Sequence, residues 1–382
     1  MKGLRKFLDK KKPLFQEGGK FSKLKSTFDA FESFLFVPNH TTKIGAHIRD
    51  SIDLKRTMII VVIALVPALL FGIYNTGYQH FLSQGTLSSV EFGDIAWYGF
   101  LKVFPIIVVS YVVGLGIEFA VAQIRNHQVN EGFLVSGMLI PLIVPVETPL
   151  WMIAVATAFA VIIGKEIFGG TGMNIWNPAL LTRAFLFFAY PTKMSGDTVW
   201  IADKADAFSG ATPLAKAITQ GVEGYSVSDS FWGFIPGSIG ETSTFAILLG
   251  AIILLITGIA SWRIMLSVFA GGALMGLIFN QFAGENVFMQ IPYWHHLILG
   301  GFAFGAVFMA TDPVTGSQTN RGKYIYGFLI GLIAVIIRVV NPAYPEGMML
   351  AILLLNTFAP TIDHYVVQGN VKRRLKRAKV KA

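Results

Sequence analysis

Ionisable side chains lie within or beside long apolar stretches of the chain, where a charge is costly unless a partner or a function compensates it. They are Glu118, Glu131, Lys165, Glu166, Arg183, Asp312, Arg338, Glu346 and Asp363. Carboxylate and carbonyl oxygens suit hard cations such as Na⁺, so the acids as a set are candidates for a cation path. Taken singly, each residue could equally be an interfacial anchor or one half of a structural salt bridge.

Two phenylalanines precede one of these acids on a short, glycine-rich segment that ends just before Asp312. Phe304 and Phe308 are four residues apart, so on a helix their rings fall on the same face. Two stacked rings there could form a hydrophobic constriction of the kind that gates a channel. Ordinary aromatic packing explains the same spacing.

A glycine-rich turn at residues 169–178, GGTGMNIWNP, carries two amide side chains. Glycine allows the backbone to approach a ligand closely. Asn174 and Asn177 would place two groups that both donate and accept hydrogen bonds one helical turn apart. The pair could bind a polar ring edge such as that of a flavin. Asn177 before Pro178 also fits a helix N-cap, and the two interpretations are compatible.

A second turn, DAFSGATPL at residues 206–214, consists mostly of small residues. Ser209, Gly210 and Ala211 would present the hydroxyl of Thr212 at its surface. Turns of this composition are common, so the residues alone assign it no chemistry.

Other classes of site are excluded by what the chain lacks. It contains no cysteine, which removes thiolate metal sites and cysteine-held iron–sulfur clusters. Gly114 and Gly116 begin a dinucleotide-type pattern, but Phe119 stands where the third glycine is needed. We therefore expect no nicotinamide site in this chain. The basic segments lie at the chain ends and do not indicate nucleic-acid binding.

Composition identifies the elements that must hold these residues in place. Of 382 residues, 53% are hydrophobic and only 14% are charged, whereas soluble domains carry roughly 25% charged residues. The apolar residues also occur in long runs. The sequence therefore predicts an all-α integral membrane protein.

We expect about ten transmembrane helices. The hydrophobic segments are 57–74, 98–122, 132–147, 150–169, 176–190, 243–260, 264–283, 297–311, 324–340 and 347–364. Segments three, five and eight are short for a full crossing, and the third and eighth are interrupted by proline or rich in glycine. Short, broken segments five positions apart are typical of two inverted five-helix repeats with a transport site between discontinuous helices.

Charge placement sets the orientation. Both chain ends are strongly basic, so the positive-inside rule places both termini in the cytoplasm. Loops 75–97, 284–296 and 341–346 contain no lysine or arginine, and loop 191–242 has three lysines against six acids. These loops are therefore expected on the outer side. The expected organisation is a basic cytoplasmic segment 1–56, a first repeat 57–190, an extracytoplasmic loop 191–242, a second repeat 243–364 and a basic tail 365–382.

Four extended stretches resemble a known family. They are GKEIFGGTGMNIWNPALLTRAFLFFAYP at 164–191, GETSTFAILLGAIILLITGIASWRIM at 240–265, LGGFAFGAVFMATDPVTGSQTNRGKYIYG at 299–327 and RVVNPAYPEGMMLAILLLNTFAPTIDHYVVQGNVKRRL at 338–375. In this order they resemble the B subunits of the bacterial Na⁺-translocating NADH:quinone oxidoreductase (Nqr), and the resemblance runs nearly end to end. The D subunit of the related Rnf complex is homologous. The basic N-terminal extension favours the first family.

The resemblance implies a fold like that of the urea and ammonium channels, with short broken helices three and eight. It implies FMN attached through its phosphate to Thr212 of the motif Ser209-Gly210-Ala211-Thr212 by a separate flavin transferase. It also implies riboflavin bound without a covalent link near Asn174 and Asn177. Membrane acids of the family are linked to Na⁺ uptake, and Glu131, Asp312 and Asp363 match them best. Phe304 and Phe308 are the expected gate on the Na⁺ path.

The resemblance further implies a translocase component that is active only in the complex with the A, C, D, E and F subunits. It would pass electrons to quinone in the bacterial inner membrane, surrounded by lipid. Two alternatives remain: the D subunit of an Rnf-type ferredoxin:NAD oxidoreductase, and a non-redox channel or transporter on the same fold.

Overall fold

The computed structural model describes residues 2–16, 18–36, 42, 44–48, 52, 54–125, 132–284, 286–341 and 347–380. All regular elements in these residues are helical, as the apolar composition predicts. Five helices are long and apolar enough to cross a membrane. They are α3 (Leu54–Ser83), α4 (Phe92–Ile124), α12 (Trp262–Gln281), α16 (Asn320–Val340) and α17 (Met348–Val380).

The other predicted hydrophobic segments contain shorter helices. They are α5 (Phe133–Ile143), α6 (Leu150–Val161), which continues as a π-helix at Ile162–Glu166, α7 (Pro178–Ala189), α11 (Thr244–Ile256) and α15 (Phe302–Phe304), which continues as a π-helix at Gly305–Met309. The third, fifth and eighth segments are thus short, as predicted. The sequence did not predict that the fourth and sixth would also be shorter than a full crossing.

The remaining α-helices lie outside the predicted spans, except that α14 overlaps the first residues of the eighth. They are α1 (Lys2–Lys11), α2 (Lys25–Leu35), α8 (Pro191–Met194), α9 (Pro213–Gln220), α10 (Val227–Trp232), α13 (Val287–Gln290) and α14 (His295–Ile298). Helix α17 continues unbroken from the tenth hydrophobic segment to Val380. No helix end marks the expected boundary between the second repeat and the tail.

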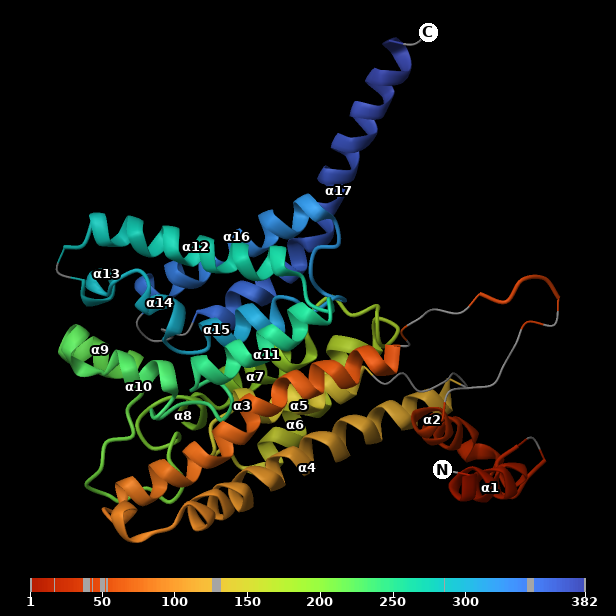
Figure 1. Cartoon of the computed structure of the whole chain (residues 1–382), viewed down its shortest axis with the longest axis horizontal. Helices are drawn as coiled ribbons and strands as arrows, with labels where there is room; N and C mark the ends of the chain where they lie inside the picture. Colours follow the sequence, from red (N-terminus) through yellow and green to blue (C-terminus); the bar gives the residue numbers. More distant parts are fainter. Residues whose placement is uncertain are drawn as a thin grey trace.

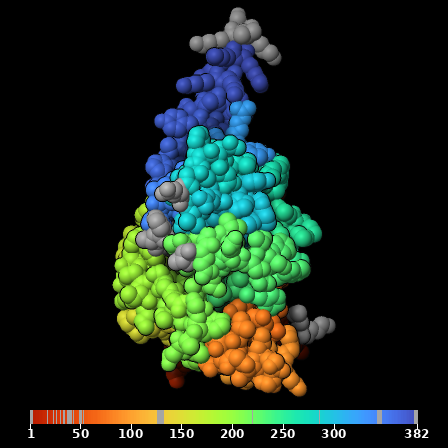
Figure 2. Space-filling model, turned by 90° about the vertical axis from the view of Figure 1, so that its left-hand side faces the viewer, coloured from red at the N-terminus to blue at the C-terminus, as the bar shows by residue number. Residues whose placement is uncertain are grey.

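The two chain ends emerge at the same end of the helical bundle, whereas α9, α10, α13 and α14 lie at the opposite end (Figure 1). Figure 2 shows this opposite end, where residues 191–242 (green) spread between the α3–α4 turn (orange) and the region of α12 to α14 (cyan). The two faces of the bundle therefore carry different chemistry. One bears the basic termini and the other bears the loop with Thr212.

Close backbone packing joins the helices of the second half. Helices α12 and α16 pack against each other. A side chain at Gly271 would overlap the carbonyl of Phe328, and one at Gly331 would overlap the carbonyl of Val268. Small residues at such crossings let helices associate by direct van der Waals contact, which suits an environment without a hydrophobic driving force.

Candidate functional site

Two regions hold most of the predicted site residues: a cavity at the end of the bundle that carries the chain termini, and a loop at the other end. The cavity is enclosed by segments from both halves of the chain. Its lining residues are Thr57, Met58, Val61, Gly132, Val135, Ser136, Leu139, Lys165, Thr171, Asn174, Asn177, Pro178, Leu254, Ile259, Ala260, Phe308, Thr311, Asp312, Pro313 and Val314. Three sets of predicted residues thus meet there: the two asparagines, one acid and one phenylalanine.

Asn177 has both roles that the sequence predicts. It is the N-cap of α7, and its side-chain oxygen accepts hydrogen bonds from the backbone N–H of Ala179 and Leu180. Its amide nitrogen donates to Asp312 Oδ2 at 3.2 Å. A single side chain therefore connects the start of α7 in the first half to the turn after the broken helix in the second half.

Asn174 does not lie one helical turn from Asn177, because α7 begins only at Pro178. Residues 171–177 form an irregular turn in which Asn174 Nδ2 donates to the carbonyl of Trp176 at 3.0 Å. The prediction that the two amides are one helical turn apart was therefore wrong. Both amides nevertheless line the same cavity.

Asp312 is held by donors from its own turn as well as by Asn177. Its Oδ1 accepts a hydrogen bond from the Val314 backbone N–H at 3.0 Å, and its Oδ2 accepts one from Thr315 Oγ1 at 3.0 Å. A carboxylate has about four lone-pair sites, so these contacts fix its orientation and leave acceptor capacity toward the cavity.

A buried ion pair lies beside the cavity. Lys165 donates to Glu118 Oε1, and the two side chains are only 3% and 4% exposed. The other carboxylate oxygen of Glu118 is buried and has no hydrogen-bond partner in the described part of the chain. The sequence identified both charges within apolar segments but gave no reason to pair them. Only the packing of α4 against the end of α6 brings them together.

The other predicted ion-path residues differ in placement. Glu131 lies outside the described residues. Asp363 on α17 does not line the cavity; its carboxylate accepts hydrogen bonds from Ser317 Oγ, from the backbone N–H of Gln318 and from Thr319. These hydrogen bonds stabilise the turn that precedes α16.

Phe304 and Phe308 contact each other, with ring centroids 5.0 Å apart, but their planes are tilted by 52° instead of stacked. Both are buried. Phe308 lines the cavity, whereas Phe304 is not among its lining residues.

The cavity combines mostly apolar walls with a small number of polar groups. They are two amides, a carboxylate, the ammonium group of Lys165 and four hydroxyls. The Thr171 hydroxyl oxygen is buried without a hydrogen-bond partner among the described residues. A buried orphan hydroxyl costs free energy, so a ligand with polar atoms would stabilise it.

The second region is the loop that carries Thr212. This residue is the N-cap of the eight-residue helix α9, and its Oγ1 accepts a hydrogen bond from Ala215 N at 3.3 Å. Ser209 is exposed, Gly210 is buried, and Ala211 and Thr212 are partly buried. The N-terminus of a helix favours negative charge. A phosphate attached to Thr212 would therefore lie in a favourable field.

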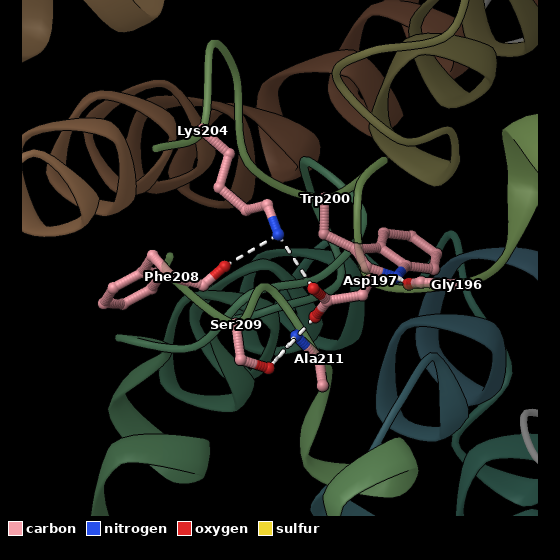
Figure 3. A network of polar contacts seen from close by, with 7 residues as sticks. All are labelled: Gly196, Asp197, Trp200, Lys204, Phe208, Ser209 and Ala211. Carbon is pink, nitrogen blue, oxygen red and sulfur yellow. Dashed lines mark hydrogen bonds and ion pairs between the residues drawn. The ribbon is translucent and has the colours of Figure 1, made fainter. Parts of the chain in front are cut away.

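A polar cluster holds this loop in shape (Figure 3). Lys204 Nζ donates to Asp197 Oδ2 at 2.8 Å and to the carbonyl of Phe208 at 2.7 Å. Ser209 Oγ donates to Asp197 Oδ1 at 3.0 Å. A side chain at Gly210 would overlap the carbonyl of Asp197. The hydrogen bond from Lys204, assisted by those from Ser209 and Gly210, holds the pKa of Asp197 below its usual value.

The cluster is anchored in turn to the transmembrane helices. Asp203 pairs with Lys102 of α4 at 2.7 Å and accepts a hydrogen bond from Tyr98. These two donors, Lys102 first, lower the pKa of Asp203. His80 of α3 contacts the carbonyl of Ala202 at 2.8 Å. The sequence predicted none of these contacts, although the acids and lysines of the loop were visible in it.

Helix α9 also contacts the broken helix of the second half. Gly300 has a φ of +62°, and a side chain there would lie 2.8 Å from Leu214 Cδ1. Arg338, which is fully buried, donates to the carbonyls of His296 and Leu299 at 2.6 and 2.9 Å. The two hydrogen bonds from Arg338 satisfy carbonyls at the end of α14, just before Gly300. At Gly300 the apolar segment leaves helical geometry.

Comparison with known proteins identifies relatives over nearly the whole chain. The NQR2, RnfD, RnfE family matches residues 41–372. The chain is 50% identical to the B subunit of the Na(+)-translocating NADH-quinone reductase of Chromohalobacter salexigens, over 98% of this chain and 97% of that protein. It is 50% identical to the B subunit of the Ectopseudomonas mendocina enzyme and 48% identical to that of the Stutzerimonas stutzeri enzyme, in each case over 98% of this chain and 99% of the relative.

The match therefore covers both regions described above, the cavity and the Thr212 loop, together with the helices that hold them. On this similarity the chain is a member of the NQR2, RnfD, RnfE family.

Proposed function

We propose that this chain is the membrane-embedded B subunit of a sodium pump driven by electron transfer from NADH to quinone. The observation that carries the proposal is the near full-length similarity to proteins named as the B subunit of the Na(+)-translocating NADH-quinone reductase. The chain would act with the A, C, D, E and F subunits of that complex. It would lie in the bacterial inner membrane with both termini in the cytoplasm.

The proposed architecture is ten spans in two inverted five-helix repeats. Helix pairing supports it: α4 packs on α6 as α12 packs on α16, and α6 packs on α7 as α16 packs on α17. Helices α3 and α11, which would begin the two repeats, pack against each other. In this proposed arrangement the short segments α5 and α15 would occupy matching positions in the two repeats.

Thr212 is proposed to carry FMN through a phosphoester made by a flavin transferase on the outer side. Its position at a helix N-terminus and the rigid cluster around Asp197 support this assignment. When bound, the flavin would accept and release electrons. The residues of this chain hold the loop in shape and provide the helix field at the attachment point.

Riboflavin is proposed to bind in the cavity, with Asn174 and Asn177 reading its polar edge and the orphan hydroxyl of Thr171 as a further partner. Asp312 would lie on the Na⁺ path, with Phe308, backed by Phe304, as the gate. Asp363 and Glu131 are proposed to belong to the same path nearer its ends. Quinone would be reduced within this same chain.

The decisive experiment is a denaturing gel of the complex from cells that express the transferase. We expect the band of this chain to fluoresce under ultraviolet light in the wild type, and to be dark in Thr212→Val. Thr198→Val, an exposed threonine of the same loop, is the matched control and should fluoresce. A dark wild-type band would favour a non-redox transporter on the same fold.

The gate is tested separately. The double variant Phe304→Ala with Phe308→Ala should change Na⁺ transport in vesicles more than it changes NADH-driven quinone reduction. Equal Na⁺ pumping per electron in both proteins would remove the gate proposal and leave the flavin proposal intact.

A further inference from the structure

A second pocket lies at the end of the bundle that carries the chain termini, next to the cavity described above, with which it shares Ile259 and Ala260. It is formed where the turn after α11 leads into α12, beside the first turn of α16. Its lining residues are Leu255, Gly258, Ile259, Ala260, Ser261, Trp262, Arg263 and Lys323. One wall is therefore apolar, and the rim carries two positive charges.

Neither positive charge is neutralised by the protein. In the described ranges, no carboxylate lies within ion-pair distance of Arg263 or Lys323, so neither side chain has an acidic partner there. The Arg263 guanidinium lies 5.3 Å from the centre of the Trp262 ring, and this cation–π contact holds it in place. Two fixed cations at one pocket attract an anion.

The pocket also contains unused hydrogen-bonding capacity. Ser261 is the N-cap of the 20-residue helix α12, yet its side chain makes no capping hydrogen bond. Its hydroxyl oxygen is buried and has no partner in the part of the chain that the structure describes. The first N–H groups of a helix also lack intrahelical acceptors. An anion at this point would satisfy the hydroxyl and meet the positive end of the helix.

The surroundings indicate which anion fits. Because α12 and α16 are long enough to cross the membrane and both begin here, the pocket lies at the membrane boundary. Trp262 and Tyr324 are exposed at this level, with ring centroids 6.0 Å apart, which is typical of an interfacial aromatic belt. Leu255, 42% exposed, lies beside them on the lipid-facing side.

We infer that this pocket binds the phosphate group of an anionic phospholipid, with the acyl chains against Leu255 and Trp262. Arg263, Lys323 and Ser261 would contact the phosphate oxygens. The site does not involve the flavin residues, so its test is independent of the function proposed above.

The test uses the delipidated, purified complex and native mass spectrometry. Dioleoylphosphatidylglycerol, dioleoylglycerol with the same chains but no phosphate, and inorganic phosphate are titrated separately. We expect phosphatidylglycerol to bind, and Arg263→Gln with Lys323→Gln to weaken one site by roughly tenfold or more, because each cation near an anionic lipid contributes to affinity. Ser261→Ala, a milder change, should weaken it by roughly threefold.

The matched control is Arg321→Gln with Lys376→Gln, which removes the same charge at the same end of the molecule but outside the pocket. Equal weakening in this control, or unchanged binding in the pocket variants, would overturn the proposal. Dioleoylglycerol binding as tightly as phosphatidylglycerol would also overturn it. Inorganic phosphate that binds alone and fully displaces the lipid would identify a free anion as the ligand and overturn the lipid assignment. An unchanged elution volume in size-exclusion chromatography for every variant shows that the purified particle has assembled as in the wild type.

Discussion

The Thr212 loop and the inner cavity are built in opposite ways. The loop is a nearly continuous stretch, residues 196–212, whose polar side chains bond one another at the surface. The cavity is assembled from segments as distant as Thr57 and Val314, with a buried ion pair beside it. The comparison teaches that a local site depends on a few hydrogen bonds near the surface, whereas a site built from segments distant in the sequence depends on the packing of the whole bundle.

The largest effect is expected from breaking the ion pair beside the cavity. Lys165→Met leaves Glu118 buried without its partner, and loss of one member of a buried pair costs about 3–5 kcal/mol. The concentration of denaturing detergent that unfolds the complex should decrease accordingly. Adding Glu118→Gln in the same chain should restore most of the stability. Lys193→Met, at an exposed lysine, should have no effect. A double variant as unstable as the single one would contradict this account.

A smaller effect is expected at the contact between the start of α7 and the turn that contains Asp312. Asn177→Ala removes the N-cap of α7, worth about 1 kcal/mol, together with the contact to Asp312. Flavin that is extracted from the complex by acid should decrease, while the covalent fluorescent band stays unchanged. Asn286→Ala, which removes the N-cap of α13, is the control. Equal loss of extractable flavin in the control would show that capping alone, and not the cavity, is responsible.

The smallest effect is expected in the exposed loop. The pKa of Asp197 is lowered in the folded loop, mainly by Lys204, so its carboxylate stabilises the loop above the ordinary aspartate pKa of about 3.9. That contribution is lost as the pH falls through the lower, folded value. For a pair this exposed it is at most about 1 kcal/mol.

Hydrogen exchange of residues 196–212, corrected for intrinsic rates, measures this pH dependence. In the wild type the corrected exchange of the loop should become faster toward low pH. In Asp197→Asn it should be faster at every pH. Asp206→Asn, at an exposed aspartate, should follow the wild type. If Asp197→Asn kept the wild-type dependence, another group would control the loop.

The sequence predicted the features that depend on residues close together in the chain. Apolar runs located the helices, and the Asn-Pro pair at 177–178 predicted the start of α7. Short-range rules could not predict the conformation of the turn at 171–177. This turn is irregular and forms part of the cavity wall. The pairing of Lys165 with Glu118, 47 residues apart, and that of Lys204 with Asp197 depend on tertiary contacts, which periodicity does not encode.

Leu214 of α9 lies against Gly300. Gly300 is the point between α14 and α15 where the apolar segment leaves helical geometry. Hydrogen is the largest group that position 300 accommodates without displacing its neighbours. Close-packed interfaces resist compression, so an approach of α9 toward the break would require the Leu214 side chain to change its rotamer. A displacement of the Thr212 loop would therefore act on the residues around Gly300 through this leucine.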